Sequence, residues 1–592
     1  MSNAEQLIKL LDYNLVNQKF DNAKKLLDDE EQYGKVILSH YSDVIQEVVL
    51  KHLTPENYQS QPQLYEACEY ILNLFAKKCH QQGILFEFLE LIETVKDDDV
   101  FRSILKALQV ILLNQSESKT RSLEYTLNSI EDYIQQLELP KLFNKKYLEE
   151  EEEKLLENDE KVRRILMNYL TLDLFYKPIL TQVVENSSGV SNNFRSTKYN
   201  RRNVLFCFIL RLLGKPLSHL DLSFNTESQK VKTYSREVAE NIVASLCKLH
   251  VNVYDLLKYV EIQYRWPAKD KIDDDMTNIF LHPEKFPLHE VGILFYLIIG
   301  EGICYESVPK VYNPKYILNM GLYLVNKLVS ANESIIPKGL KLCEKMLINI
   351  NDFIKADELD DDIFMDFCNS LIKVIIYSPS KPNRKLGLEV LRMYILKFDT
   401  AGRFLLIKNV MKTSTHKGLI GYLTTLYKDI IFENIDCQVI SQHLSGFNLK
   451  QLLFDHICKL ENGVQCDLTD SSDQIIAALN FLIGLILRDK ENKTGIKDHV
   501  KALQSGFLND LRYALDFSRA HFKEEFERVR SGAADNQKFP SMDVEILNDE
   551  AGLNEVTKER KLEMLNSALM MFDLIDFQLA RVTETIDRII QK

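Results

Sequence analysis

The sequence predicts an all-α protein built as an α-solenoid, a row of stacked helical hairpins. The first observation is the scarcity of turn formers: the 592 residues contain only 20 glycines and 14 prolines, whereas proteins on average contain about 7% and 5% of these residues. The second is that apolar residues recur at helical spacing along the chain, while the alternating pattern of strands is scarce. The third is a weak internal repeat between residues 330 and 490.

The segment NRKLGLEVLRMYILKF, residues 383–398, shows what kind of helix the repeat contains. It is apolar around most of its circumference, and charge is confined mainly to a strip of Lys385, Glu389 and Arg392. In a stack of helix pairs, an inner helix contacts its own partner and the pairs before and after it, so one strip is left for solvent or a ligand. A core helix of a closed bundle would look the same, but the continuation of the repeats along the chain favours the solenoid.

A Gly-Leu pair marks the start of three of these helices. The glycines are Gly339, Gly387 and Gly418, and each precedes about three apolar turns. We expect them to permit a close approach of neighbouring helices. A related helix without the glycine covers residues 473–489.

Breaks in composition divide the chain. The Ser/Asn-rich stretch at 186–203 predicts a flexible loop, and 531–552 predicts a loop between the last helices. We therefore expect the following parts: an N-terminal helical-repeat array at 1–185, the loop at 186–203, middle helical repeats at 204–330, and C-terminal repeats at 331–592 that include the loop at 531–552.

Charge and hydropathy exclude several classes of function. The net charge of −13 argues against nucleic-acid or anionic-membrane binding, which needs a concentrated positive field. Apolar runs such as VGILFYLII at 291–299 are far shorter than the roughly 20 residues that span a bilayer. The N-terminus has no signal-peptide pattern, and no CxxC occurs among the cysteines. We expect a soluble cytoplasmic protein without membrane or nucleic-acid partners.

Motifs of catalysis are absent from the sequence. No Walker loop, GxSxG or HExxH occurs. The group His456, Cys458 and Cys466 lacks a fourth ligand for structural zinc and lies in helical context. We therefore expect no catalytic residues, no metal and no cofactor, and predict that the chain is not an enzyme.

The last amphipathic segment, residues 565–590, allows two interpretations. Its apolar residues fall roughly at coiled-coil spacing, but Asp573 and Asp576 interrupt the seam and the segment is shorter than four heptads. Packing as the last helix of the solenoid is favoured over a terminal coiled coil.

Several stretches of the C-terminal half resemble the glomulin family of HEAT-like helical-repeat proteins. They are VPKVYNPKYILNMG (308–321), PKGLKLCEKMLINI, RKLGLEVLRMYILKFD, TSTHKGL, AALNFLIGLILRDKENKTG (477–495), SRAH and LNSALMMFDLIDFQLARV. The wider group is similar to a plant root-formation regulator and to fungal proteins that bind a redox transcription factor. The resemblance covers roughly 305–590 and makes the expected fold an α-solenoid of HEAT-like helical-hairpin repeats.

This resemblance implies a non-enzymatic function. Such proteins bind the RING-box subunit of cullin-RING ubiquitin ligases, together with its cullin, through their C-terminal repeats. They mask the surface that recruits the ubiquitin-conjugating enzyme, so steric competition alone inhibits ubiquitin transfer. The family has also been linked to an immunophilin, a further partner for which no residue of this chain gives support.

The partner-binding residues that the resemblance implies lie in three places. They are Thr413, His416 and Lys417 at the head of one inner helix; Asn480, Arg488, Asn492 and Lys493 in the next inner helix and its following loop; and Ser518, Arg519 and His521 in the helix after that. Lying at the ends of successive helices, they are expected to line one rim of the stack. The competing interpretation is that they cap helix ends.

Two other functions stay open. The chain could be a helical-repeat scaffold or adaptor for a transcription factor or a kinetochore-type assembly, like the fungal relatives. It could also be an enzyme on a helical fold, whose sign would be a cavity with buried, unpaired charged groups.

Overall fold

The computed structural model describes residues 3–29, 33–115, 119–187, 198–224, 231–266, 278–531 and 558–590. Within these ranges the chain is helical and contains no strand; the only β pairing is an isolated parallel bridge between Ile354 and Phe398. The predicted all-α class is thereby confirmed.

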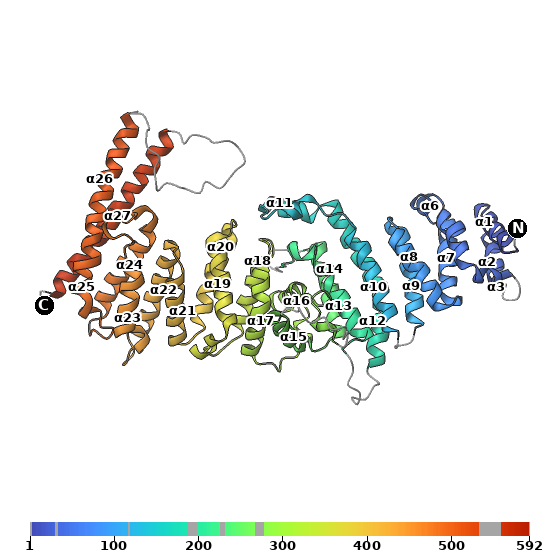
Figure 1. The fold of residues 1–592 in the computed structure, drawn as a ribbon, viewed down its shortest axis with the longest axis horizontal. Coiled ribbons are helices and arrows are strands. Elements are labelled where there is room, and N and C mark those ends of the chain that lie inside the picture. Colours follow the sequence, from blue (N-terminus) through green and yellow to red (C-terminus); the bar gives the residue numbers. More distant parts are fainter. Residues whose placement is uncertain are drawn as a thin grey trace. The chain divides into compact units, whose positions relative to one another are not determined.

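Figure 1 shows the helices in the order in which they follow one another along the chain. The first are α1 (Asn3–Val16), α2 (Phe20–Asp28), α3 (Tyr33–Ser39), α4 (Tyr41–Val44), α5 (Leu50–His52), α6 (Pro55–Ser60), α7 (Pro62–Lys78), α8 (Gln81–Thr94), α9 (Asp98–Leu113), α10 (Thr120–Gln135), α11 (Glu150–Glu157) and α12 (Glu160–Ser187). The next are α13 (Arg201–Arg211), α14 (Tyr234–Leu249), α15 (Leu257–Arg265), α16 (Leu288–Phe295), α17 (Pro314–Val329), α18 (Ile336–Ile348) and α19 (Asp362–Tyr377). The last are α20 (Lys381–Leu396), α21 (Thr400–Thr413), α22 (Lys417–Asn434), α23 (Gly446–Leu452), α24 (Leu468–Arg488), α25 (Val500–Leu503), α26 (Asn509–Ser531) and α27 (Lys558–Ile590).

Shorter helical turns lie between or at the ends of these helices. The π turns are η1 (Ile45–Val49), η6 (Tyr296–Gly300), η10 (Leu453–Ile457) and η13 (Gln504–Leu508). The 3₁₀ turns are η2 (Lys141–Asn144), η3 (Leu217–His219), η4 (Val253–Leu256), η5 (Ile279–Leu281), η7 (Tyr305–Ser307), η8 (Ala356–Asp360), η9 (Gln442–Leu444), η11 (Gly463–Gln465) and η12 (Ile496–His499).

The chain forms two compact units. Unit 1 contains Met1–Ile350 and Ile363–Gly387, and unit 2 contains Asn351–Asp362 and Leu388–Lys592. In unit 1, α7 packs on α9, α8 on α10, α10 on α13, α12 on α14, and α17 on both α16 and α18. Each helix therefore packs on near neighbours in the sequence, as a helical-repeat solenoid requires. The four ranges expected from the sequence stay a prediction. The two units divide between Gly387 and Leu388, inside α20, where none of the expected ranges begins or ends.

Unit 2 repeats this pattern of packing between near neighbours. α22 packs on α21 and α24, α24 packs on α27, and α26 and α27 form an antiparallel hairpin (Figure 1). α27 is therefore the last helix of the stack, as favoured from the sequence. Buried side chains fill the spaces between these helices; examples are Leu423 and Tyr427 of α22, Phe481 and Leu485 of α24, and Phe572 of α27.

The charged strip of α20 has the exposure expected from the sequence. Lys385, Glu389 and Arg392 are exposed, whereas Val390, Leu391, Tyr394 and Ile395 of the same helix are buried. The apolar circumference is therefore covered by protein and the charged strip faces solvent.

Close helix approach occurs at glycines, although not at all three that the sequence indicated. A Cβ at Gly339 would lie 2.9 Å from the Cβ of Leu328, and one at Gly387 would lie 3.0 Å from Ile375. On α22 the glycine at the close approach is Gly421, where a Cβ would lie 2.8 Å from the backbone oxygen of Asp473 on α24. The expectation for Gly418 was wrong, because its nearest neighbour is the ring of His416, two residues earlier in the chain.

Helix α24 is long and apolar enough to cross a membrane. The helix has 21 residues, and 56% of its most apolar stretch is buried. The helix packs between α22 and α27. These contacts account for its apolar composition as that of a core helix.

The range 186–203, expected as a loop, is described only at its two ends. Residues 188–197 lie outside the described ranges, but α13 begins at Arg201. The Asn200 side chain caps this helix by accepting the N–H of Asn203, and the buried Arg201 guanidinium donates to the carbonyl oxygen of Leu112 at 3.0 Å. A cap and an anchored cation therefore start the helix earlier than the polar composition suggested. Most of the loop expected at 531–552 lies outside the described residues.

Candidate partner-binding surface of the C-terminal helices

Helices α22 and α24 run parallel and share an exposed face. At their N-terminal ends the backbone of Gly421 meets that of Asp473, and at their C-terminal ends the Arg488 guanidinium lies 3.2 Å from the Asp436 carboxylate. We call Phe432, Asn480, Leu487 and Arg488 the α22–α24 face. The three α24 members fall on one side of that helix because they are spaced by seven and eight residues.

The aromatic ring at the centre of the α22–α24 face is held from two sides. A Cβ at Gly484 would lie 2.8 Å from the Phe432 ring, so the ring packs against bare backbone. The Arg488 guanidinium lies over the same ring, 4.9 Å from its centroid. Leu487, the residue before Arg488, is 57% exposed. Aromatic and arginine side chains are enriched at protein–protein contact sites.

The loop after α24 is organised by a buried carboxylate that the sequence analysis did not single out. Asp489 accepts the N–H of Lys493 and the N–H of Thr494, both at 2.8 Å, and the Thr494 hydroxyl. Asn492 adopts φ 59°, and its side chain bonds to Lys497 N and to Asp498. These contacts fix the loop.

Lys493 fastens this loop to the end of α22. Its ammonium donates to the carbonyl oxygens of Ile435 at 3.3 Å and Cys437 at 3.1 Å. A cation is favourable there because unpaired carbonyls point out of a helix C-terminus. Asn492 and Lys493 therefore have structural roles, which supports the competing interpretation made from the sequence.

The predicted residues before α22 also serve the fold. The Thr413 hydroxyl donates to the carbonyl of Asn409 in its own helix at 2.9 Å. His416 is the N-cap of α22, and its Nδ1 accepts the N–H of Leu419 at 3.1 Å. Lys417 is buried and pairs with Glu461 at 2.6 Å. This pairing offsets the cost of a cation at a helix N-terminus.

The expectation that all these residues line one rim was wrong. Thr413, His416 and Lys417 lie at the N-terminal end of α22, whereas Arg488 and Lys493 bond to its C-terminal end. An 18-residue helix is about 27 Å long at 1.5 Å per residue. Because α24 runs parallel to α22, the head of one helix and the tail of the next lie on opposite rims.

The third group lies on the α26–α27 hairpin. Arg519 donates to Asp573 at 3.0 Å and to Asp576 at 3.1 Å, so the two aspartates that interrupt the coiled-coil seam serve the hairpin contact. Ser518 is half-buried, and His521 is exposed.

Exposed apolar side chains on this hairpin were not among the residues predicted from the sequence. They are Tyr513 (64% exposed) and Phe517 (66%) on α26, and Met570 (67%), Leu574 (47%) and Phe577 (60%) on α27. Their spacings of four, four and three residues place each set on one helix face, opposite the buried residues. This second apolar periodicity is visible in the sequence.

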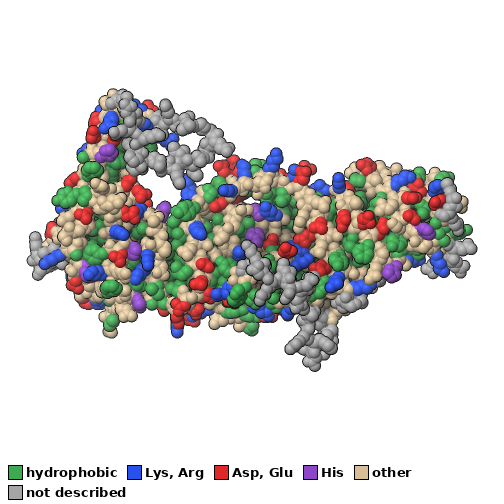
Figure 2. Space-filling model, viewed as in Figure 1, with side chains coloured by type: hydrophobic (Ala, Val, Ile, Leu, Met, Phe, Trp, Pro, Cys, Tyr) green, Lys and Arg blue, Asp and Glu red, His purple; other side chains and the backbone are tan. Residues whose placement is uncertain are grey.

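Over the described ranges, no group of three or more His, Cys, Asp or Glu side chains could hold a metal ion. On the face seen in Figure 2, acidic and basic side chains are intermixed and no single-sign patch dominates. The arrangement is suited to binding a protein through mixed apolar and polar contacts.

A family model described as YAP/Alf4/glomulin matches residues 7–550. The chain belongs to this family. Glomulin of Mus musculus is 27% identical over 534 residues, which covers 88% of this chain and 84% of the mouse protein. Glomulin of Homo sapiens is 26% identical over 578 residues, covering 96% of this chain and 91% of the human protein.

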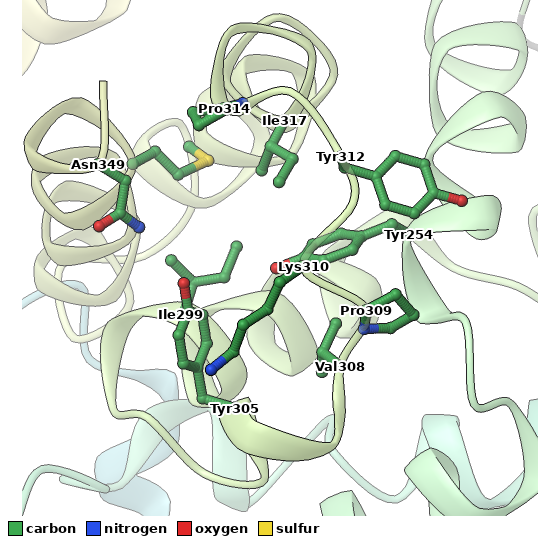
Figure 3. Close-up of a pocket in the computed structure, with 11 residues that line it drawn as sticks. Tyr254, Ile299, Tyr305, Val308, Pro309, Lys310, Tyr312, Pro314, Ile317 and Asn349 are labelled. Atoms are coloured by element: carbon green, nitrogen blue, oxygen red, sulfur yellow. The ribbon is translucent and has the colours of Figure 1, made fainter. Parts of the chain in front are cut away.

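The segment 308–321, part of the resemblance to glomulin, borders a cavity of about 160 Å³ in unit 1. Figure 3 shows Val308, Pro309 and Tyr312 on one side of this cavity and Asn349 on the other. The Tyr312 hydroxyl donates to Asp255 at 2.9 Å. Asn313 caps α17, and Pro314 is its first residue. The segment thus acts structurally by fixing the start of α17.

Proposed function

We propose that this chain is a non-catalytic inhibitor of cullin-RING ubiquitin ligases. Its C-terminal helices bind the RING-box subunit, in complex with its cullin, and cover the surface that recruits the ubiquitin-conjugating enzyme. Membership of the glomulin family is the observation that carries this proposal, and the match covers most of the chain.

The mechanism needs only shape and affinity. Two proteins cannot occupy one RING surface, so a bound helical repeat prevents recruitment of the conjugating enzyme without any reacting group. A specific interface buries about 1,600 Å² in total. Exposed apolar side chains on α24, α26 and α27 supply contacts of the kind that dominate binding energy.

The ten residues implied by the family resemblance fall into two groups, those that hold the fold and those that are exposed. Thr413, His416, Lys417, Asn492 and Lys493 hold their own helix ends or loops. Asn480, Arg488 and His521 are exposed, and we assign the partner contact to them and to Leu487. Ser518 is half-buried, and Arg519 contributes through the hairpin that it holds.

The test is binding of the full chain to a purified RING-box–cullin complex, measured by isothermal titration calorimetry. The double variant Leu487→Ala/Arg488→Ala should weaken binding at least tenfold. Phe447→Ala is the matched control, because Phe447 on α23 is also an exposed apolar residue, 75% accessible. Absence of binding by the unmodified chain would overturn the proposal; equal affinity of the double variant would move the interface away from the α22–α24 face.

A second function has support in the name of the matching family model, which refers to the kinetochore. An adaptor for such an assembly, or for a transcription factor, would use the same helical surfaces with a different partner. Co-purification of kinetochore proteins without a RING-box–cullin complex would favour this alternative.

A further inference from the structure

Unit 1 contains a cavity of about 430 Å³ between α10, α12, α13 and α16. Its apolar wall comes from several buried or half-buried side chains: Ile134, Leu137, Leu139, Ile165, Phe208 and Leu212. Cavities of this size and character are typical of sites for small organic molecules, which are oriented by a few polar groups.

One cation on the polar side of this cavity is already neutralised. The Arg211 guanidinium donates to both carboxylate oxygens of Glu131, with Nε at 2.8 and 2.9 Å. It also donates to the carbonyl oxygen of Lys285 at 3.3 Å. Bidentate pairs of this kind are among the strongest ion pairs. The guanidinium of Arg211 is therefore not free to bind an anionic ligand.

The carboxyl group of Glu290 is not satisfied in this way. Its Oε2 atom is buried and has no hydrogen-bond partner among the described residues. The Nδ1 atom of His289 lies 3.8 Å from this Oε2 atom, which is beyond hydrogen-bond length. A buried acceptor without a donor costs about 1–3 kcal/mol, more if it is charged.

Gly214 confines this carboxyl group. A Cβ at Gly214 would lie 2.9 Å from Oε1 of Glu290, so only glycine leaves room for the side chain in this position. Burial raises the pKa of Glu290 to about 7, although its own N–H and Arg211 act in the other direction. An acidic group poised near neutrality in a cavity is a feature of ligand sites.

We propose that this cavity binds an organic cation, a protonated amine on an apolar body, whose ammonium group donates to Glu290. The apolar wall takes the body of the ligand, and the ammonium supplies the donor that Oε2 lacks. An anionic ligand would meet an unpaired carboxylate instead. The site is independent of the proposed ligase inhibition and lies in the other unit.

The arrangement favours binding over catalysis. Among the cavity-lining residues there is no serine or cysteine that could act as a nucleophile. His289 is not a lining residue, and its Nδ1 atom lies 3.8 Å from Glu290, beyond hydrogen-bond length. The Tyr169 hydroxyl is occupied, because it donates to the carbonyl of Lys215 at 3.1 Å.

The groups that face Glu290 allow a pH test. They are Glu131 on α10, Tyr169 on α12, Arg211 and Lys215 at the end of α13, and His289 on α16. Burial raises the pKa of Tyr169 and lowers that of His289, so both shifts favour the neutral side chain. A carboxyl pKa of about 7 means that the ionised fraction of Glu290 rises about tenfold between pH 6 and pH 8.

The probe is n-hexylammonium, titrated calorimetrically into the full chain, with 1-hexanol and hexanoate as matched ligands. We expect saturable amine binding that is at least tenfold tighter than binding of either matched ligand at pH 8, and up to tenfold weaker at pH 6. Glu290→Gln should weaken amine binding at least tenfold, and Leu139→Trp, at the half-buried edge of the cavity, should abolish it. Glu284→Gln, at an exposed residue, is the control.

Three results would overturn the proposal: no saturable binding of the amine, equal affinity for 1-hexanol, or undiminished affinity of Glu290→Gln. Because Glu290→Gln removes a buried charge, it should fold at least as well as the unmodified chain. Thermal unfolding of each variant verifies this. None of these outcomes depends on binding to a ubiquitin ligase.

Discussion

The guanidinium of Arg488 lies over the ring of Phe432, 4.9 Å from its centroid, where the C-terminal ends of α24 and α22 meet. Gly484 leaves room for the ring on its other side. The pair therefore forms a fixed aromatic and cationic surface at one rim of the C-terminal helices.

Arg488→Ala should change stability little. The Arg488 side chain is 47% exposed and its ion-pair partner Asp436 is 79% exposed, and such a contact contributes about 1 kcal/mol or less. Thermal unfolding should therefore show almost no shift in midpoint. A large shift would mean that Arg488 holds the fold and is not free to serve a partner.

Asp489→Ala should destabilise unit 2 by about 2–4 kcal/mol, because it leaves one buried and one part-buried N–H group and a buried hydroxyl without an acceptor. Hydrogen exchange of residues 489–497 should accelerate. Asp516→Ala is the control, since Asp516 is an exposed carboxylate on α26, outside this loop. If both variants behave alike, Asp489 does not organise the loop.

Gly421→Ala should cost about 1–3 kcal/mol, because the new Cβ would lie 2.8 Å from a backbone oxygen of α24. Neither backbone can move without separating two packed helices. Gly506→Ala, where a Cβ meets nothing within 4 Å, should be neutral or slightly stabilising. Urea denaturation compares the two. A neutral Gly421→Ala would show that α22 and α24 are not in close contact there.

Glu290→Gln should become more stabilising as pH rises. The folded pKa of about 7 lies above the ordinary value of 4.5 because of burial, so ionisation of the folded protein is unfavourable and stability is lost between these two values. Between pH 5 and pH 8 the advantage of glutamine should grow by roughly 2 kcal/mol. Unfolding midpoints of both proteins at pH 5, 6, 7 and 8 measure it. A constant difference would contradict the burial of this carboxyl group.

Arg519→Ala should loosen the α26–α27 hairpin by about 1 kcal/mol, because Asp573 and Asp576 would lose their shared cation. The hairpin should then exchange amide hydrogens faster. Arg588→Ala is the control, because Arg588 is 72% exposed and pairs within its own helix with Glu584. Protection that falls equally in both variants would argue against a special role for Arg519.

The sequence predicted the fold well because helical periodicity reports which side of a helix is buried. The exposed strip Lys385, Glu389 and Arg392 follows directly from this periodicity. The sequence could not show which glycine of α22 contacts α24. The choice between Gly418 and Gly421 depends on how α22 is rotated about its own axis, and that rotation is set by tertiary packing.

The candidate site was predicted less completely. Recognising that Thr413 and Arg488 lie on opposite rims required knowing that α22 and α24 run parallel. The hydrogen bonds of Asp489 and Lys493 depend on loop geometry. The Glu290 cavity joins four helices that are distant in the sequence, so no local pattern indicates it. The apolar residues Tyr513 and Phe517, by contrast, could have been noticed as a second stripe.

The most direct measurement is ubiquitin-chain formation by a reconstituted cullin-RING ligase titrated with the full chain. Masking of the RING surface predicts that chain formation falls to background once the protein equals the ligase in concentration, and that added ubiquitin-conjugating enzyme restores it. Undiminished chain formation at a large excess of the protein would contradict the account.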